Sequence, residues 1–439
     1  MSSVVVVVPI NNQEGDERSR GVAGSVEKTT TTEERDVRCC FVCKNGFSSI
    51  KEKMAAAVKS EYDKRKLVHS IKVGIALVVV SLLYMLDPLF RQVGQNAMWA
   101  IMTVVVVFEF FAGATLSKGI NRGVGTIVGG LLGCFAAVLA DQLPGYRSAF
   151  VVGISVFIIS AAATYSRLVP GIKRKYDYGV MIFILTFNLV VVSGVRAYKV
   201  MKLARERLCT IGMGFAVCIF ISLLIFPEWA GDELHSSTAS KFDKIASSIQ
   251  GCLEEYFMVS GEKESQASAD VSGCKAVLHS KSNEESLANF AKWEPWHGKF
   301  GFSYPWGKYM EIGEALRELA ATVVSLKGCI QSPAQPLPTQ RGIIKEPCEA
   351  LGVTLVWSLR EIGESIKDMK LCRAKGTISP KLQSMKQYNL KHVNSSASDL
   401  GMATFVFLLN EMVEKVEVLA TKVEQLGDIA GFHSKKLEA

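Results

Sequence analysis

The sequence has little of what enzymes and metalloproteins need. It contains six histidines in 439 residues, and none stands near cysteines or acids at the spacing of a metal site. It has no phosphate-binding loop, no dinucleotide-binding fingerprint and no Gly-x-Ser-x-Gly nucleophile motif. These absences argue against most enzyme classes, and we expect no catalytic residue, no cofactor and no metal.

The chain also lacks the cysteine spacing of a secreted disulfide framework, although it has 11 cysteines. Most of them lie in apolar runs or in the C-terminal half, which indicates a reducing compartment for that half. Cys39, Cys40 and Cys43 form a cluster without a second pair of metal ligands. This cluster is either inert or, being close to an apolar run, a site of S-acylation.

Acidic residues are almost missing from six apolar runs that follow one another between residues 67 and 227. Glu109 is the one Asp or Glu in these runs, and the last four contain no charged residue at all. A helix needs roughly 20 apolar residues to cross a hydrocarbon layer of about 30 Å. We therefore predict six transmembrane helices, over Leu67–Leu86, Met98–Ser117, Val124–Ala140, Ser148–Ser166, Tyr178–Val195 and Leu208–Pro227.

The basic residues between the runs predict the orientation. The segments before the first run and after the second and fourth hold 12 Lys and Arg, and the opposite segments hold seven. Because basic residues favour the cytoplasmic side, we expect both termini in the cytoplasm. Val4–Val8 is too short for a signal peptide, so the first run is expected to be an uncleaved insertion signal.

Several cations lie inside the apolar runs or at their ends. Lys72 is inside the first run, where a charge usually faces protein or water, although snorkelling to the interface is an alternative. Arg122 precedes the third run, with Lys118 one turn earlier, and both could simply anchor the helix. Five basic residues in 196–207 form either a helix at the headgroups or a cationic face toward a water-filled pore. The net charge of +8 thus indicates anions or anionic lipids as partners rather than nucleic acid.

Two further features predict helix contacts. An unpaired Glu109 would be costly in the membrane, so we expect a cationic partner, Lys118 or Lys72, in a structural ion pair. Gly125, Gly129 and Gly133 have the spacing that lets helices pack closely in lipid, within one subunit or between two.

The C-terminal half lacks the alternation typical of strands. Apolar residues recur every three and four positions over 241–258, 306–330, 344–370 and 400–427, which predicts helices. We therefore expect an all-α integral membrane protein with six transmembrane helices and a helical cytosolic domain. The predicted divisions are a disordered segment 1–50, a basic juxtamembrane segment 51–66, a transmembrane pore domain 67–230 and a cytosolic domain 231–439.

One loop of the cytosolic domain, residues 292–306, is rich in tryptophan. It contains Trp293-Glu294-Pro295 and then Trp296 and Trp306. Dense aromatic residues among Pro and Gly form either a packed corner or a docking surface. We favour the packed corner, against the membrane domain, and assign Trp293, Glu294 and Pro295 a structural or gating role together with Glu109.

Four ordered motifs resemble one family. Asn96–Glu109, Gly113–Arg122 and Lys175–Phe187 resemble spans of the plant aluminium-activated malate transporters, and Trp293-Glu294-Pro295 is similar to their cytosolic signature. The resemblance runs from about residue 50 to about residue 430.

The resemblance implies a homodimeric anion channel in the lipid bilayer that conducts malate and other small anions, through a pore with rings of basic residues. Lys72 and Arg122 match family positions taken as pore-lining, and Lys118 joins them as a candidate. Arg196 and Arg207 match basic positions that flank the sixth span. The resemblance also favours the plasma membrane over the vacuolar or another endomembrane.

Alternatives remain at this point. A proton- or counter-ion-coupled exporter of organic or aromatic acids is the main one, and a membrane-anchored scaffold is another. One departure from the family concerns aluminium, because the segment before the sixth run keeps only Glu206 as an acid. Hard trivalent cations need several carboxylate oxygens, so we expect a channel that aluminium does not activate.

Overall fold

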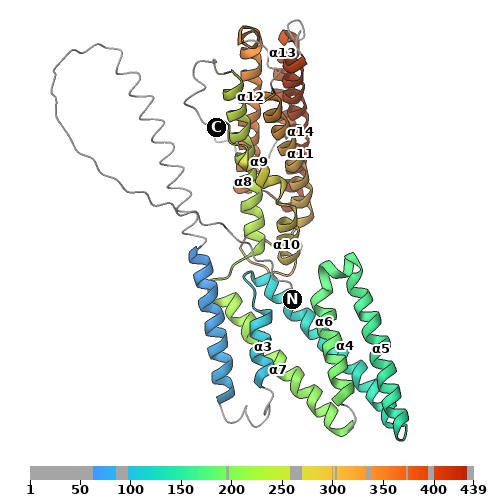
Figure 1. Ribbon diagram of the computed structural model, residues 1–439. Helices are drawn as coiled ribbons and strands as arrows, with labels where there is room; N and C mark the ends of the chain where they lie inside the picture. Colours follow the sequence, from blue (N-terminus) through green and yellow to red (C-terminus); the bar gives the residue numbers. More distant parts are fainter. Residues whose placement is uncertain are drawn as a thin grey trace, which may run out of the picture. The chain divides into compact units, whose positions relative to one another are not determined.

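The computed structural model describes most of the chain from residue 63 onward (Figure 1). The chain divides into two units, 1–66 and 67–439. The predicted disordered segment, residues 51–62, the cluster of Cys39, Cys40 and Cys43, and Arg196 lie outside the described residues. Those described are 63–85, 97–193, 197–257, 269–298, 300–301, 304–332, 338–371, 374–393 and 400–432.

Among the described residues, five helices are long and apolar enough to cross a membrane, which confirms a multi-pass membrane protein. α5 shows this most plainly, because Ala163 is its one buried residue and its exposed apolar side chains suit lipid. A shorter helix, α3 (Ala97–Val107), accompanies the five long ones. Its 11 residues rise about 16 Å, so six full-length spans stay a prediction. The long helices are Asp63–Met85, α4 (Ala112–Asp141), α5 (Tyr146–Leu168), α6 (Pro170–Ser193) and α7 (Ala197–Leu224).

The predicted boundary between the second and third spans is wrong. The chain leaves the helix at Phe108–Phe111, inside the second apolar run, and then continues as one helix through Lys118 and Arg122. The break is held by tertiary bonds: the Thr115 hydroxyl accepts the Glu109 N–H at 3.0 Å, and the Ala112 N–H donates to the Glu228 carbonyl at 3.0 Å. Lys118 and Arg122 are therefore helical residues rather than loop anchors.

The predicted basic loop between the fourth and fifth spans is also wrong, because most of that segment is helical. α5 ends at Leu168 and α6 begins at Pro170, where proline suits the first helical position because it needs no N–H partner. Arg167 donates two hydrogen bonds to Asp177, at 2.8 and 3.1 Å. This pair joins the ends of the two helices across the short turn.

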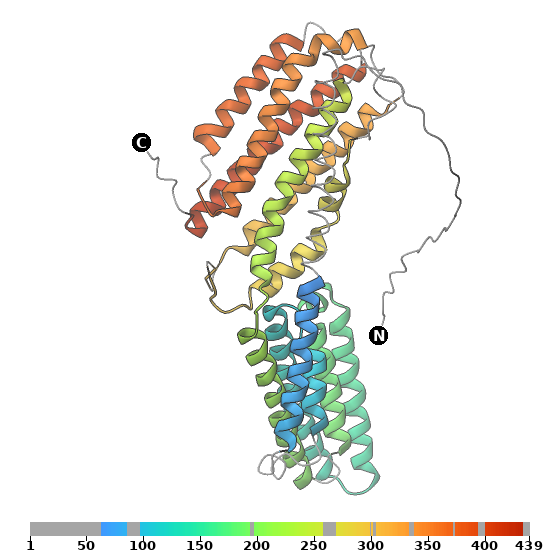
Figure 2. The same cartoon turned by 90° about the vertical axis from the view of Figure 1, so that its left-hand side faces the viewer.

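Small residues bring the membrane helices together within one protomer. Gly125, Gly129 and Gly133 of α4 face the backbone and side chains of α6 from Gly179 to Val190, so the predicted glycine contact is confirmed as an intrachain contact. Figure 2 shows these membrane helices running side by side. A second cluster of buried apolar residues joins the helix Asp63–Met85 to α3 and α7.

The C-terminal half is a bundle of helices, as predicted (Figure 1). Its core includes Phe242 of α8, Leu316 of α11, Leu359 of α12 and Phe405 of α14, all fully buried. The helices are α8 (Ala230–Phe257), α9 (Ser272–Leu278), α10 (Lys281–Ala291), α11 (Trp306–Ile330), α12 (Pro338–Lys367), α13 (Ser379–Val393) and α14 (Leu400–Ala430), with a π-helical turn, η2 (Ala374–Ile378), before α13.

A buried ionic cluster fixes α10 in this bundle. Glu284 of α10 pairs with Lys241 of α8 and with Arg317 of α11, the latter at 2.6 Å. Burial alone raises the pKa of the Glu284 carboxyl, but hydrogen bonds from Lys241, Ser280 and Arg317 outweigh it, so the pKa is lowered. A buried carboxylate that keeps its charge needs such partners, and they hold α10 and the loop that follows it.

Candidate functional site

Lys72 lies at the end of the membrane helices where α7 ends and α4 begins, which we call the domain end. Its side chain is 3% exposed, and its ammonium donates to the Phe226 carbonyl, just beyond α7. Phe226 has a left-handed φ of 44°, and carbonyls at a helix C-terminus lack partners within the helix. Lys72 therefore caps α7 from a neighbouring helix, and it neither snorkels to water nor lies in lipid.

Glu109 has the partner that the sequence predicts, because Lys118 forms an ion pair with it. The carboxylate stands in the break between α3 and α4, and the lysine is two turns into α4. Their side chains are 36% and 37% exposed, so solvent screens the pair and it contributes about 1 kcal/mol at most. The pair suits a structural role more than a proton relay.

Arg122 is a second buried cation of the membrane helices. It is 4% exposed and lies one turn before Gly125, on the face of α4 that packs against α6. Its Nη1 donates to the Tyr178 hydroxyl at 2.9 Å, and its Nε is buried without a partner among the described residues. A guanidinium has five N–H donors, so Arg122 can donate further hydrogen bonds to an anion.

Arg207 of α7 is half-buried and lies over the Trp99 ring, with its Cζ 4.5 Å from the ring centroid. Its Nε is also buried without a hydrogen-bond partner in the described part of the chain. The cation–π contact holds the charge in place without satisfying its donors. Arg196, the other predicted basic residue of this region, is not among the described residues.

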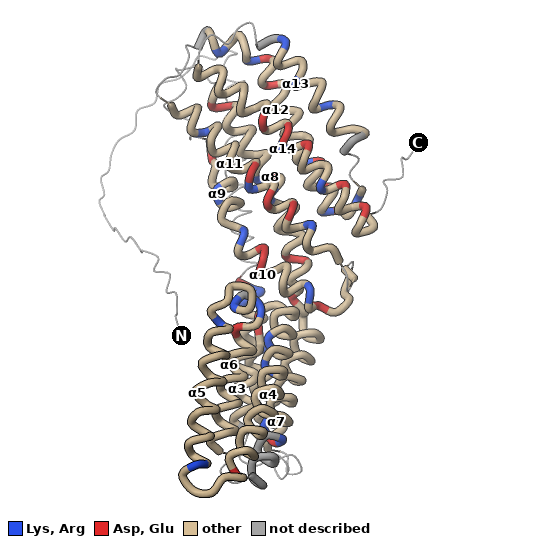
Figure 3. Tube along the Cα trace, turned by 90° about the vertical axis from the view of Figure 1, so that its right-hand side faces the viewer, with Lys and Arg blue, Asp and Glu red and all other residues tan. Residues whose placement is uncertain are grey.

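These cations stand at different depths and form no single cluster. Lys72 is at the domain end. Arg122 is ten residues after Ala112, about 15 Å along α4 from that end. Arg207 is 17 residues before Leu224, about 25 Å along α7. Figure 3 shows how few charges the membrane helices carry away from the domain end, which makes these buried cations distinctive.

Glu294 connects the tryptophan-rich loop to the start of the C-terminal bundle. Its carboxylate is 5% exposed and accepts the N–H groups of Ala230 at 2.6 Å and Gly231 at 3.1 Å. These are the first residues of α8, so Glu294 serves as a helix N-cap 64 residues away in sequence. Burial raises the pKa of the Glu294 carboxyl, against the opposing effect of the two N–H donors and of His297.

The rest of the loop is mainly a packed corner, as predicted. His297 stacks on Trp229, with ring centroids 3.9 Å apart, and Trp306 is buried. At Gly113, the second residue of α4, an added Cβ would collide with the Phe290 carbonyl and with Glu294. The loop thus touches the start of the Arg122 helix. Trp296, 71% exposed, and Trp293, 37% exposed, are exceptions to the packing.

The sequence did not indicate the partners of these cations. Tyr178 and Trp99 lie within the motifs that carry the family resemblance. An aromatic residue in an apolar run nevertheless gives no sign of the charge that it contacts. The Phe226 carbonyl belongs to the backbone and leaves no signal at all. Within the described residues, no three His, Cys, Asp or Glu side chains gather as a metal site requires.

Comparisons with known proteins identify the family. Residues 59–393 match the family described as aluminium activated malate transporter. Aluminum-activated malate transporter 12 of Arabidopsis thaliana is 43% identical over 343 residues, which cover 78% of this chain and 59% of the relative. Aluminum-activated malate transporter 2 of the same plant is 39% identical over 385 residues, covering 85% and 77%. Aluminum-activated malate transporter 1 of Triticum aestivum is 35% identical over 395 residues, covering 84% and 83%.

The chain spans 59%, 58% and 62% of the length of three of the Arabidopsis relatives it matches. The family match nevertheless takes in both the membrane helices and most of the C-terminal bundle. The chain belongs to the aluminium-activated malate transporter family.

Proposed function

We propose that this protein is a passive anion channel that conducts malate and related small anions. The observation that carries the proposal is the series of Lys72, Arg122 and Arg207 at successive depths, with unfilled donors on both arginines. The names of the relatives support malate as the substrate.

Basic groups at several depths suit conduction better than one tight site. Each cation offsets part of the hydration that an anion loses on entry, and sites of moderate strength let the ion leave again. A carboxylate can accept two N–H groups of one guanidinium at once, and the Nε of Arg122, which has no partner among the described residues, would be one of them. Arg207, held by Trp99, would meet the same anion about 10 Å farther along the path.

The proposed path lies between two copies of the chain, each of which contributes Lys72, Arg122 and Arg207, with Arg196 at the mouth. Lys72 and Arg122 are covered within one protomer. They reach a shared conduit only when the helices that cover them shift, so the conformation described here corresponds to a closed path. The contact of Glu294 with the starts of α4 and α8 makes the tryptophan-rich loop the element that couples such a shift to the C-terminal bundle.

The remaining predictions on placement belong to the same proposal. They are a plasma-membrane location, both termini in the cytoplasm, a pore domain over 67–230 and a cytosolic domain over 231–439. Fluorescent fusions at each terminus, combined with protease protection, would report both the membrane and the side.

Voltage clamp of the expressed protein tests the function itself. With malate gradients imposed at constant pH, the reversal potential of a passive channel follows the malate gradient alone. A coupled exporter would instead shift its reversal potential when the proton gradient changes. The ion pair of Glu109 with Lys118 favours the first result, because it gives this carboxylate a structural role.

A further inference from the structure

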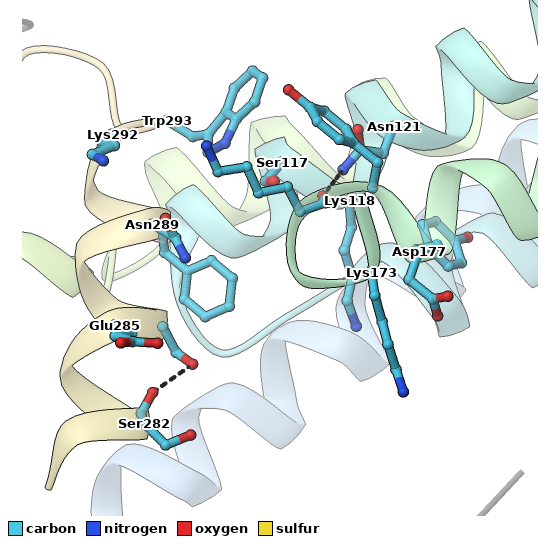
Figure 4. A pocket seen from close by; sticks show the side chains of 15 residues that line it. Ser117, Lys118, Asn121, Lys173, Asp177, Ser282, Glu285, Asn289, Lys292 and Trp293 are labelled. Atoms are coloured by element: carbon cyan, nitrogen blue, oxygen red, sulfur yellow. Dashed lines mark hydrogen bonds between the residues drawn. The ribbon is translucent and has the colours of Figure 1, made fainter. Parts of the chain in front are cut away.

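A cavity of about 620 Å³ opens at the domain end of the membrane helices. Figure 4 shows residues of α10 on one side of it and residues of α4 and α6 on the other. Three segments that the sequence resemblance had singled out separately meet here: Ser117–Asn121, Lys175–Tyr178 and Trp293. Asn121 donates to the Lys175 carbonyl at 3.3 Å, which joins two of these segments.

The cavity is positively charged. Lys173, Lys175 and Lys292 line it, all exposed, and none of the three forms an ion pair with a described residue. Two of the other charged groups on the wall are already neutralised, Asp177 by Arg167 and Lys118 by Glu109. The wall therefore carries three ammonium groups without a described ion-pair partner, and this excess of positive charge suits an anion with more than one negative charge.

The cavity is also adjacent to Arg122. Tyr178 lines the cavity, and its hydroxyl accepts the hydrogen bond from the buried Arg122 guanidinium. An anion in the cavity is thus separated from the first unfilled arginine by one aromatic side chain. Amide groups of Asn121 and Asn289 on the wall add neutral donors that suit carboxylate oxygens.

We propose that this cavity is a vestibule in which dicarboxylate anions gather before they reach Arg122. The inference rests on the proposed channel function and names the route of entry. The cavity is much larger than a four-carbon dicarboxylate, so the anion stays hydrated and exchanges rapidly. The vestibule raises the local anion concentration and does not bind tightly.

The expected enrichment follows from the charges. If each ammonium stands one Debye length, about 8 Å, from the cavity centre, three of them enrich a monoanion about 2.6-fold at physiological ionic strength. The factor is squared for a dianion, to roughly sevenfold. A monovalent cation is depleted by the same factor that enriches a monoanion. The ratio of monoanion to monovalent cation in the cavity therefore also changes roughly sevenfold.

The first test reads the potential without using current. Ser286 lines the cavity and is exposed, so S286C in the full-length protein places a thiol there. Its reaction rates with a negatively and a positively charged methanethiosulfonate are compared after subtraction of the parent's background. The triple change K173Q, K175Q and K292Q should lower the rate ratio roughly sevenfold. The matched triple K345Q, K367Q and K391Q, on exposed lysines of α12 and α13, should leave it unchanged.

The second test uses malate current from the domain side. The cavity triple should raise the malate concentration for half-maximal current roughly sevenfold without changing the maximal current, and the control triple should change neither. An unchanged thiol-rate ratio in the cavity triple overturns the vestibule, whatever the current does. If the thiol-rate ratio falls in the cavity triple but the parent protein carries no malate current, the anion vestibule is upheld and the channel function is refuted.

Discussion

Replacing Glu294 by alanine should loosen the first turn of α8 and with it the joint between the membrane helices and the C-terminal bundle. The carboxylate accepts two backbone N–H groups, at 2.6 and 3.1 Å, in a site where it is 5% exposed. Each buried N–H left without a partner costs about 1–3 kcal/mol. Desolvation of the carboxylate, which raises its pKa, offsets part of that, so we expect a net loss of about 2–4 kcal/mol.

Hydrogen exchange measured by mass spectrometry on the full-length protein gives this energy locally. A loss of 2–4 kcal/mol corresponds to amide exchange roughly 30- to 1,000-fold faster in a peptide covering the start of α8. E294Q keeps one acceptor and should show an intermediate rate. E346A, on an exposed glutamate of α12, should leave exchange unchanged. Unaltered exchange at residues 230 and 231 in E294A would show that the capping role is wrong.

Three other predictions follow from the same structure. Because the pKa of Glu294 is raised in the fold, the stability that this group contributes is fully present below its unfolded pKa and is lost as pH rises through its folded pKa. The thermal stability of the parent should therefore rise relative to that of E294Q as pH falls from 7.5 toward 5. Parallel curves of the two proteins against pH would contradict this. G129V should destabilise the membrane bundle by about 1–3 kcal/mol, because a Cβ there lies 2.7 Å from the Phe183 carbonyl, whereas G130A meets nothing within 4 Å and should be tolerated in detergent melts. Micromolar Al³⁺ at acid pH should leave malate current unchanged, since the segments predicted to be outside offer only Asp87, Asp141 and Glu206 as carboxylate ligands, and a steep rise in current would refute this.

The sequence predicts the parts of the fold that depend on hydrophobic periodicity. The long apolar runs and the stripes of the C-terminal helices have the expected periods, and α11 begins and ends where its pattern does. The stripe of α14 is less exact, because Leu400 is 82% exposed at the start of the helix, where too few neighbours remain to cover it. α9 and α10 were not predicted, since short helices carry few apolar repeats.

Breaks and partners set by tertiary contacts could not be predicted. Apart from Glu109, the run around Phe108 is apolar, and the sequence gives no sign that the helix breaks there, because the break depends on Thr115 and on a carbonyl at Glu228. Lys118 and Arg122 were expected in a loop between two spans, yet the segment is helical and Gly119 is needed where Phe215 of α7 crosses α4. The sequence placed Lys72 and Arg122 inside the membrane domain, but their burial within one protomer is visible only once the helices are packed.

The measurement that tests the central claim most directly is malate current through R122Q, normalised to surface abundance. Removing a charge from a buried site should lower the current at least tenfold, because a single ion pair at about 4 Å is worth about 4 kcal/mol at an effective dielectric constant of 20. R122K keeps the charge, and Y178F removes the Arg122 hydrogen bond without changing charge, so both should retain most of the current. Normal current in R122Q at normal abundance would show that the anion path does not pass Arg122.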